Sequence, residues 1–265
     1  MGTVSLLHVM TFNLLYASVD GPHRWADRRP VVHALLDAER PDLIGTQEGL
    51  AAQLDDVRAD LGPGYGFVGT GRDGGTDGEF TAVLYRVERL TPVRHGVFWL
   101  SDTPDVAASN TWGARCVRMA TWVRFLDRVT GRELYAVNTH FDHISENARR
   151  RSAALIRDRL AALEPGLPVV LTGDFNAAAG TESPAYRLLT RDVGLVDVWT
   201  VAARRGPDHG TWHGFGPVAD GGPRIDWILV TPDVAVEAAA VNLFRSGGRF
   251  PSDHLPVQAH LRLPG

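Results

Sequence analysis

Short apolar runs that resemble β-strands recur along the whole sequence, and they constrain the fold more than any other feature. They lie at residues 7–14, 42–46, 80–85, 97–100, 119–125, 134–139, 169–171, 224–230 and 257–263. Between these runs lie segments whose apolar residues have helical spacing, at residues 31–36, 50–61, 147–163 and 183–189. Because strands outnumber helices, and hairpin-like connections mix with helical crossings, the pattern favours mixed sheets packed together with helices outside. A doubly wound parallel sheet fits it less well.

Length and composition narrow the class of protein. The chain has 265 residues, 44% of them hydrophobic, with no linker or repeat, so we expect a single catalytic domain over residues 1–265. No apolar run approaches the roughly 18 residues of a membrane span, and no cationic segment precedes the first apolar residues. One cysteine, Cys116, excludes an internal disulfide. We therefore expect a cytoplasmic protein with no membrane association and no obligate protein partner.

The basic residues are all arginine, because the sequence contains no lysine. This excludes a phosphate-binding loop that uses lysine, as well as any lysine nucleophile or Schiff base. The net charge of −4 argues against a protein whose main task is to bind polyanions. The glycine-rich stretch at residues 69–78 lacks the helix and lysine of a nucleotide loop, and its aspartates predict a flexible surface loop.

Polar side chains follow or interrupt many of the apolar runs. They are Asn13, Glu48, His140, Asp174, Asn176, Asp226, Asp253 and His254. Each of them alone has an ordinary structural explanation, such as a turn cap or a satisfied core residue. Their repetition in segment after segment indicates instead that strand ends project polar groups into one cleft, since buried charges need partners or a metal.

This set of side chains suits hydrolysis assisted by a hard cation. Carboxylate and amide oxygens are the ligands that Mg²⁺ or Mn²⁺ prefer, and zinc is the lesser alternative. Asp226 and His254 suit an acid–imidazole pair in which the carboxylate favours the charged ring. The sequence holds neither the paired histidines of a zinc protease nor a G-x-S-x-G nucleophile elbow.

In order along the chain, these motifs resemble those of the endonuclease/exonuclease/phosphatase (DNase I-like) superfamily, and most of all its bacterial metal-dependent hydrolases. The matching segments are Thr11–Asn13, Gln47–Glu48, Asn138–His140, Thr172–Asn176, Arg224–Asp226 and Ser252–His254. The likeness spans residues 10–257, which is nearly the whole chain. It implies an α+β fold, a four-layer α/β/β/α sandwich of two packed mixed β-sheets with helices on both outer faces.

The resemblance also implies roles for individual residues of these motifs. The metal ligands would be Glu48, as the principal one, with Asn13, Asp253, Asp174 and Asn176. The catalytic set would be His254, Asp174, Asn176, Asp226 and His140. His140 would either hydrogen-bond a phosphate oxygen or protonate the leaving group. Whether Asp174 or His254 is the base is left open.

Contacts to the substrate are predicted from position rather than from motifs. Arg118 begins one strand-like run, Arg86 follows another, and each is equally well explained as an exposed strand-end arginine. His143 closely follows His140, in a segment that forms either a pocket wall or the start of a helix. Aromatic and imidazole side chains that could line a substrate pocket are Trp25, Trp99, Trp112, Trp212 and His213.

The leading hypothesis is a Mg²⁺- or Mn²⁺-dependent phosphoesterase that cleaves a mono- or diester of a small phosphorylated molecule by in-line attack of water. A nuclease or deadenylase is the alternative, and it would need a basic groove. A lipid phosphodiesterase would need export and a membrane-docking loop. A catalytically inactive binding module is the further alternative, although it would tolerate substitutions in the motifs and none is found.

Overall fold

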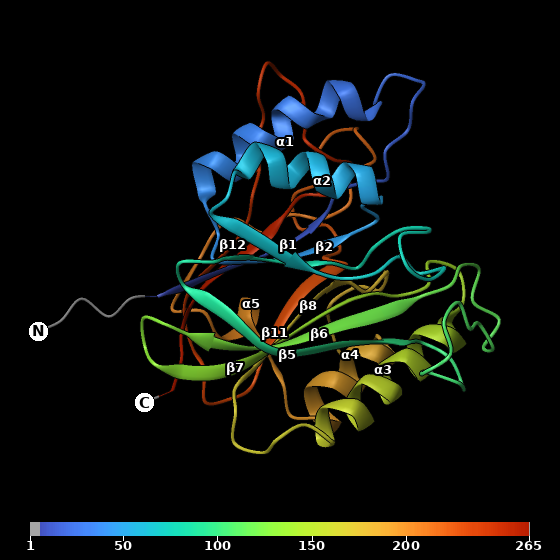
Figure 1. The fold of residues 1–265 in the computed structure, drawn as a ribbon, viewed down its shortest axis with the longest axis vertical. Coiled ribbons are helices and arrows are strands. Elements are labelled where there is room, and N and C mark those ends of the chain that lie inside the picture. The colour runs from blue at the N-terminus through green and yellow to red at the C-terminus, as the bar shows by residue number, and fades with distance from the viewer. Residues whose placement is uncertain (1–5, 265) are drawn as a thin grey trace, which may run out of the picture.

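Two β-sheets packed face to face form the centre of the protein, as the computed structural model of residues 6–264 shows (Figure 1). The seven-stranded sheet is mixed, with β1 parallel to β2 and antiparallel to β13. In spatial order its strands are β10 (Arg204–Arg205), β12 (Ala235–Val241), β13 (Val257–Arg262), β1 (Leu7–Asn13), β2 (Leu43–Gln47), β4 (Val83–Arg86) and β3 (Tyr65–Val68).

The six-stranded sheet is mixed as well, because β7 runs parallel to β8 while the other pairs are antiparallel. Its strands, in spatial order, are β5 (Leu90–Trp99), β6 (Met119–Asp127), β7 (Arg132–His140), β8 (Val169–Asp174), β11 (Asp226–Val230) and β9 (Val196–Asp197). A turn at Thr130-Gly131 joins β6 to β7, where Gly131 takes a left-handed conformation with φ 71°.

Helices cover the outer face of each sheet (Figure 1). Those on the seven-stranded sheet are α1 (Trp25–Glu39) and α2 (Ala51–Leu61). Those on the six-stranded sheet are α3 (Glu146–Ala161), α4 (Pro184–Arg187) and the π-helical turn η1 (Leu188–Asp192). The short α5 (Val198–Val201) follows β9. The four-layer sandwich expected from the sequence is therefore confirmed. None of the helices in residues 6–264 has the length and apolar character needed to cross a bilayer.

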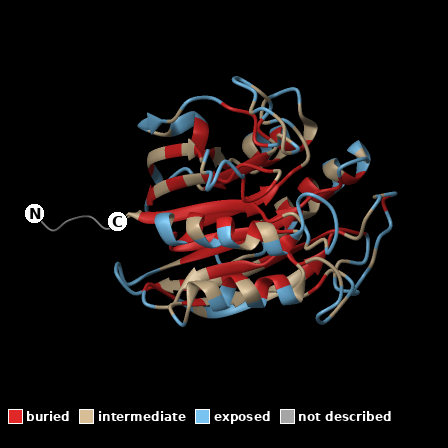
Figure 2. Ribbon diagram, turned by 90° about the horizontal axis from the view of Figure 1, so that it is seen from above, coloured by how far each residue is buried: buried red, intermediate tan, exposed pale blue. Residues whose placement is uncertain are grey.

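Three apolar clusters hold the layers together. One lies between the sheets and includes Val9, Phe125 and Ile228, and the other two lie beneath the two helical layers. Figure 2 shows the strands as an almost continuous buried interior with exposed residues at its margin. This rigid interior fixes the positions of the strand ends.

A polar contact crosses the apolar interior near one end of the sheets. Asn138 on β7 donates to the carbonyls of Thr46 and Ala82, and its Oδ1 accepts from Gln47 Nε2 at 2.7 Å and Thr172 Oγ1 at 3.1 Å. The sheets approach so closely here that a Cβ on Gly45 would lie 2.6 Å from Asn138 Oδ1. This network ties β2 to β7 and β8 just below the strand ends.

The glycine-rich segment at residues 69–78 lies at the surface, as the sequence predicts, and forms a hydrogen-bonded turn. Gly71 pairs with Phe80, Arg72 Nη1 donates to Glu79 Oε2 at 2.6 Å, and Trp99 Nε1 donates to the carbonyl of Arg72 at 2.6 Å. The ion pair that closes the turn lies near the strand ends, since Glu79 Oε2 is 3.8 Å from Arg118 Nη1.

Candidate active site

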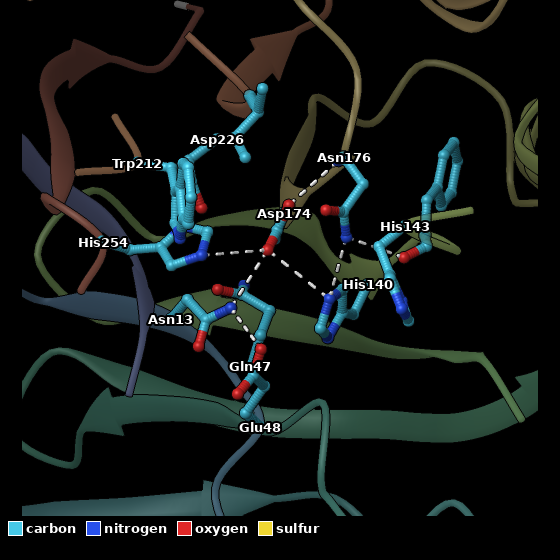
Figure 3. A network of polar contacts seen from close by, with 12 residues as sticks. Asn13, Gln47, Glu48, His140, His143, Asp174, Asn176, Trp212, Asp226 and His254 are labelled. Carbon is cyan, nitrogen blue, oxygen red and sulfur yellow. Dashed lines mark hydrogen bonds and ion pairs between the residues drawn. The ribbon is translucent and has the colours of Figure 1, made fainter. Parts of the chain in front are cut away.

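Polar side chains gather where the carboxyl ends of the parallel pairs β1/β2 and β7/β8 meet. Asn13 pairs in register with Gln47 at the end of one sheet, and His140 pairs with Asp174 at the end of the other. Asp226 lies opposite Asp174 because β11 runs antiparallel to β8. The sheets are stacked, so these ends face one common space, and Figure 3 shows the side chains pointing into it.

Asn13 joins the carboxylates of the two sheets. Its Nδ2 donates to Glu48 Oε1 and to Asp174 Oδ2, both at 3.0 Å, while its Oδ1 accepts from the backbone N–H of Leu15. Glu48 stands just past β2 with φ 62°, and this left-handed conformation turns it out of the strand direction. Asn176 has a similar φ of 48° just past β8. Positive φ at such residues is uncommon, and it often marks a functional site.

His254 and Asp226 form a buried pair. His254 Nδ1 lies 3.0 Å from Asp226 Oδ2, and His254 Nε2 lies 3.7 Å from Asp174 Oδ2. Burial alone would lower the pKa of His254, but the carboxylates of Asp226 and Asp174 outweigh it and raise that pKa to about 10. The imidazole is therefore a cation at neutral pH, with Nδ1–H directed at Asp226.

Asp174 lies at the centre of the cluster and is almost fully buried. Burial and the nearby Asp226 carboxylate raise its pKa to about 6, although His254, the backbone N–H of Asn176 and the Asn13 amide act in the opposite direction. Its protonation state can therefore change close to neutral pH, which is the property that a general base needs.

His140 lies on the other side of Asp174 and is held by Arg118. Arg118 Nη1 donates to His140 Nδ1 at 2.8 Å, and His140 Nε2 lies 3.4 Å from Asp174 Oδ2 and 3.1 Å from Asn176 Nδ2. Because a guanidinium can only donate, the neutral ring carries its proton on Nε2, and of these two neighbours only the carboxylate can accept it. Burial, together with the positive charge of Arg118, holds the pKa of His140 well below its ordinary value.

The donor atoms of the cluster fit a divalent cation. Glu48, His140 and Asp174 form one group whose possible ligand atoms lie within 4.8 Å of one another, and Asp174, Asp226 and His254 form a second. Each histidine could serve as a ligand only after it lost the proton on the nitrogen that faces the ion. Asp226 Oδ1 is buried without a hydrogen-bond partner. Carboxylates crowded in this way repel one another, and a hard cation would offset their charge.

The structure brings most of the predicted site residues together. Arg118 and His143 lie beside His140, with 3.3 Å between Arg118 Nη2 and His143 Nδ1. Asp253 adjoins the cluster through His254, but among residues 6–264 it belongs to neither potential metal group, and its Oδ2 accepts from Trp212 Nε1 at 3.4 Å.

Arg86 is the exception, because the structure places it away from the cluster. Its Nη1 donates to Asp42 Oδ1 at 3.2 Å, at the end of β2 that lies away from Glu48. The reason is strand direction. β4 runs antiparallel to β2, so the end of β4 lies far from the end of β2.

The tryptophans proposed as pocket walls divide into two kinds. Trp25, Trp99 and Trp112 are buried packing residues, so they are not available to a substrate. His213 packs against Phe250, with 4.2 Å between ring centroids. Only Trp212 of this group presents a large exposed surface at the site.

Asp142 organises the segment after His140, whose role the sequence left open. Its carboxylate accepts four backbone N–H groups, from Arg115 and Cys116 on one oxygen and from Ile144 and Ser145 on the other. It thereby anchors the segment that leads into Arg118 to the segment that follows His140. The helix-start interpretation of this region is the better one, since Ser145 caps α3 by accepting from the N–H of Ala148.

Comparison with known proteins identifies the arrangement. The model of the endonuclease/exonuclease/phosphatase family matches residues 10–254. An endonuclease/exonuclease/phosphatase from Bacteroides vulgatus is 36% identical, with a TM-score of 0.91 over 98% of this chain and 99% of its own. A mannosyl-6-phosphatase from Bacteroides thetaiotaomicron is 35% identical, with a TM-score of 0.89 over 96% and 99%. TDP2 of D. rerio, solved with a single-stranded DNA product, is 18% identical with a TM-score of 0.75 over 97% and 99%, which shows a shared fold alone.

Proposed function

The chain belongs to the endonuclease/exonuclease/phosphatase family, and we propose that it is a Mg²⁺- or Mn²⁺-dependent phosphoesterase that hydrolyses a phosphate ester of a small molecule. The observation that carries this proposal is the convergence of Glu48, Asp174 and His254 at the ends of two stacked sheets. Glu48 would be the principal ligand of the cation, and Asn13 would position its carboxylate. Once bound, the cation would offset the negative charge that builds on the phosphoryl oxygens.

Within this site we assign the base to Asp174 rather than to His254. A group that takes a proton from water must be unprotonated beforehand, and His254, with its pKa raised to about 10, is already charged at neutral pH. Asp174, with its pKa raised to about 6, is largely ionised there and can still accept a proton. His254 would instead donate Nε2–H to a phosphoryl oxygen, oriented by Asp226.

His140 would act as a hydrogen-bond donor rather than as the acid that protonates the leaving group. Its pKa lies well below the ordinary value because of burial and the charge on Arg118, so the ring is neutral in the free enzyme. Arg118 keeps the remaining proton on Nε2, which faces Asp174 and the space above it. The neutral N–H can therefore bind a phosphoryl oxygen without transferring its proton.

A small substrate fits the charges around the site better than a nucleic acid does. The net charge is −4, and Arg118 is the arginine that contacts the catalytic histidines. Arg28 lies nearby, but its guanidinium donates to the backbone carbonyls of Leu14, Leu15 and Tyr16. A polynucleotide would require a row of free cations along its backbone. The 35% identity with a mannosyl-6-phosphatase over nearly the full length also favours a phosphomonoester of a small molecule.

The experiment that tests this function is a substrate panel assayed with Mg²⁺, Mn²⁺ or EDTA. The panel holds sugar phosphates, nucleoside monophosphates, bis-p-nitrophenyl phosphate and oligonucleotides, and a His254→Ala variant is assayed beside the wild type. We expect metal-dependent release of phosphate from small monoesters and a loss of about 10²–10⁴-fold in the variant. Cleavage confined to oligonucleotides would instead establish a nuclease, and no turnover with any substrate would favour the inactive binding module.

A further inference from the structure

Trp212 is the tryptophan that the fold leaves exposed. Its relative exposure is 59%, whereas Trp25, Trp99, Trp112 and Trp227 are each at 8% or less. A large aromatic ring gains free energy from burial, so an exposed indole is a feature that packing does not account for. Aromatic side chains beside a few convergent polar groups commonly line sites for small molecules.

The exposed indole stands directly beside the catalytic cluster. The backbone of Trp212 forms a β-bridge with His254, and Figure 3 shows the ring next to the His254 imidazole. Its Nε1 lies 3.4 Å from Asp253 Oδ2, the residue before His254. The position of the ring is thus coupled to the segment that carries the catalytic imidazole.

The loop that follows Trp212 supports one edge of the ring. Gly214 has φ 54°, and a Cβ at this residue would lie 3.2 Å from Cζ2 of the indole. The backbone N–H groups of His213 and Gly214 both donate to the carbonyl of Asp253. A side chain at residue 214 would crowd the ring and strain the backbone, so the loop conformation and the ring placement depend on glycine there.

We propose that Trp212 is a specificity-determining residue that stacks on the sugar ring of a sugar phosphate whose phosphoryl group occupies the cluster of Asp174, His140 and His254. This rests on the proposed function. The C–H face of a pyranose ring is apolar and lies flat against an indole, while its hydroxyl edges need hydrogen-bond acceptors. The Asp253 carboxylate supplies such acceptors at the edge of the ring.

A sugar fits this site better than a nucleobase because of charge. The Asp253 carboxylate lies at the edge of the indole, and it suits the hydroxyl donors of a neutral sugar. A nucleobase could also stack, so a nucleoside 5′-monophosphate provides the competing arm of the test.

The kinetic test compares a hexose 6-phosphate with the acyclic hexitol 6-phosphate, which carries similar hydroxyls but no ring. Trp212→Ala should lower kcat/KM for the cyclic substrate by about tenfold, mainly through KM, and for the acyclic one by less than about threefold. Trp212→Phe keeps an aromatic face and should recover most of the difference. Val129→Ala is the matched control, since Val129 is an exposed apolar residue at the distant β6–β7 turn.

Binding without turnover separates this proposal from the proposed function. The indole N–H signals of the seven tryptophans can be followed by ¹⁵N NMR, and Trp212→Phe identifies the signal of Trp212 by its disappearance. Hexose 6-phosphate added with Mg²⁺ to the slowly hydrolysing His254→Ala variant should shift that signal, whereas inorganic phosphate and hexitol 6-phosphate should shift it far less. This shift would support stacking of the sugar ring on Trp212 even if no phosphoester were hydrolysed.

Two results would overturn the proposal. One is an equal loss of kcat/KM for cyclic and acyclic substrates in Trp212→Ala, which would indicate a structural role only. The other is a Trp212 signal that does not respond to hexose 6-phosphate, or that responds more strongly to a nucleoside 5′-monophosphate.

Discussion

Gly45 on β2 offers the sharpest test of how the two sheets create the site. It faces the six-stranded sheet at the polar contact between Asn138 and Gln47, two residues before the end of β2. A Cβ at this position would lie 2.6 Å from Asn138 Oδ1 and still closer to Thr172 Oγ1. Ordinary contacts of a Cβ begin at 3.4 Å, and Thr172 Oγ1 would lie only 2.1 Å away, so Gly45→Ala requires the sheets to separate locally by about 1.3 Å.

The cost of that separation can be worked out from the contacts it breaks. Asn138 is held by two donated and two accepted hydrogen bonds, so it cannot move aside freely. Overpacking in a buried site costs about 1–3 kcal/mol, and each weakened hydrogen bond adds about 1 kcal/mol. We therefore expect Gly45→Ala to lower the free energy of unfolding by about 3–5 kcal/mol. For a chain of this length, that corresponds to a fall in Tm of about 6–10 °C.

Calorimetric melting of Gly45→Ala against wild type measures this effect. Gly64→Ala is the matched control, because a Cβ there would meet nothing within 4 Å, and its stability should change by no more than about 1 kcal/mol. Adding Thr172→Ala removes the nearest atom, so the double variant should be more stable than the sum of the single changes predicts. A Tm for Gly45→Ala within about 2 °C of the control would refute the reasoning.

Three further predictions concern charge. Burial would raise the pKa of Asp142, but its backbone N–H donors lower that pKa below the ordinary value of 3.8. The ionised carboxylate therefore stabilises the fold above pH 3.8, and this stabilisation is lost as the pH falls through the pKa of the folded state. Asp142→Asn should therefore lower Tm at pH 7, by an amount that shrinks in acid, as a calorimetric pH series would show. Arg89→Met removes the shared cation of Asp42 and Asp127, both buried, and should cost about 3–5 kcal/mol in urea unfolding. Mg²⁺ should raise the Tm of wild type but not that of Glu48→Ala, since an ion stabilises only the state that binds it.

The strand ends of the site could be predicted from the sequence because each lies at a local boundary. Asp174 and His140 both end apolar runs, and the run itself indicates a buried strand. What local patterns cannot give is the direction of one strand relative to another. Arg86 and Arg118 looked alike in the sequence, but β4 carries Arg86 away from the site, whereas the start of β6 lies beside the end of β7 and places Arg118 against His140.

The Asp226–His254 pair could be predicted from the sequence, but other side-chain partners across distant segments could not. Arg118 was predicted to bind phosphate, yet two of its guanidinium nitrogens already contact His140 and His143. The exposure of Trp212 could not be distinguished from the burial of Trp99 or Trp112, because tryptophan occurs in both settings. These differences arise from tertiary packing, which no local spacing encodes.

The central claim is that the cluster around Glu48 and Asp174 performs metal-dependent hydrolysis of a phosphate ester. The most direct measurement is the initial rate of phosphate release from hexose 6-phosphate as a function of Mg²⁺ concentration, for wild type and for the nearly isosteric Glu48→Gln. We predict a wild-type rate that is abolished by EDTA and rises to saturation with Mg²⁺, and a Glu48→Gln rate at least about 100-fold lower. A wild-type rate that survives EDTA, or full activity in Glu48→Gln, would contradict this account.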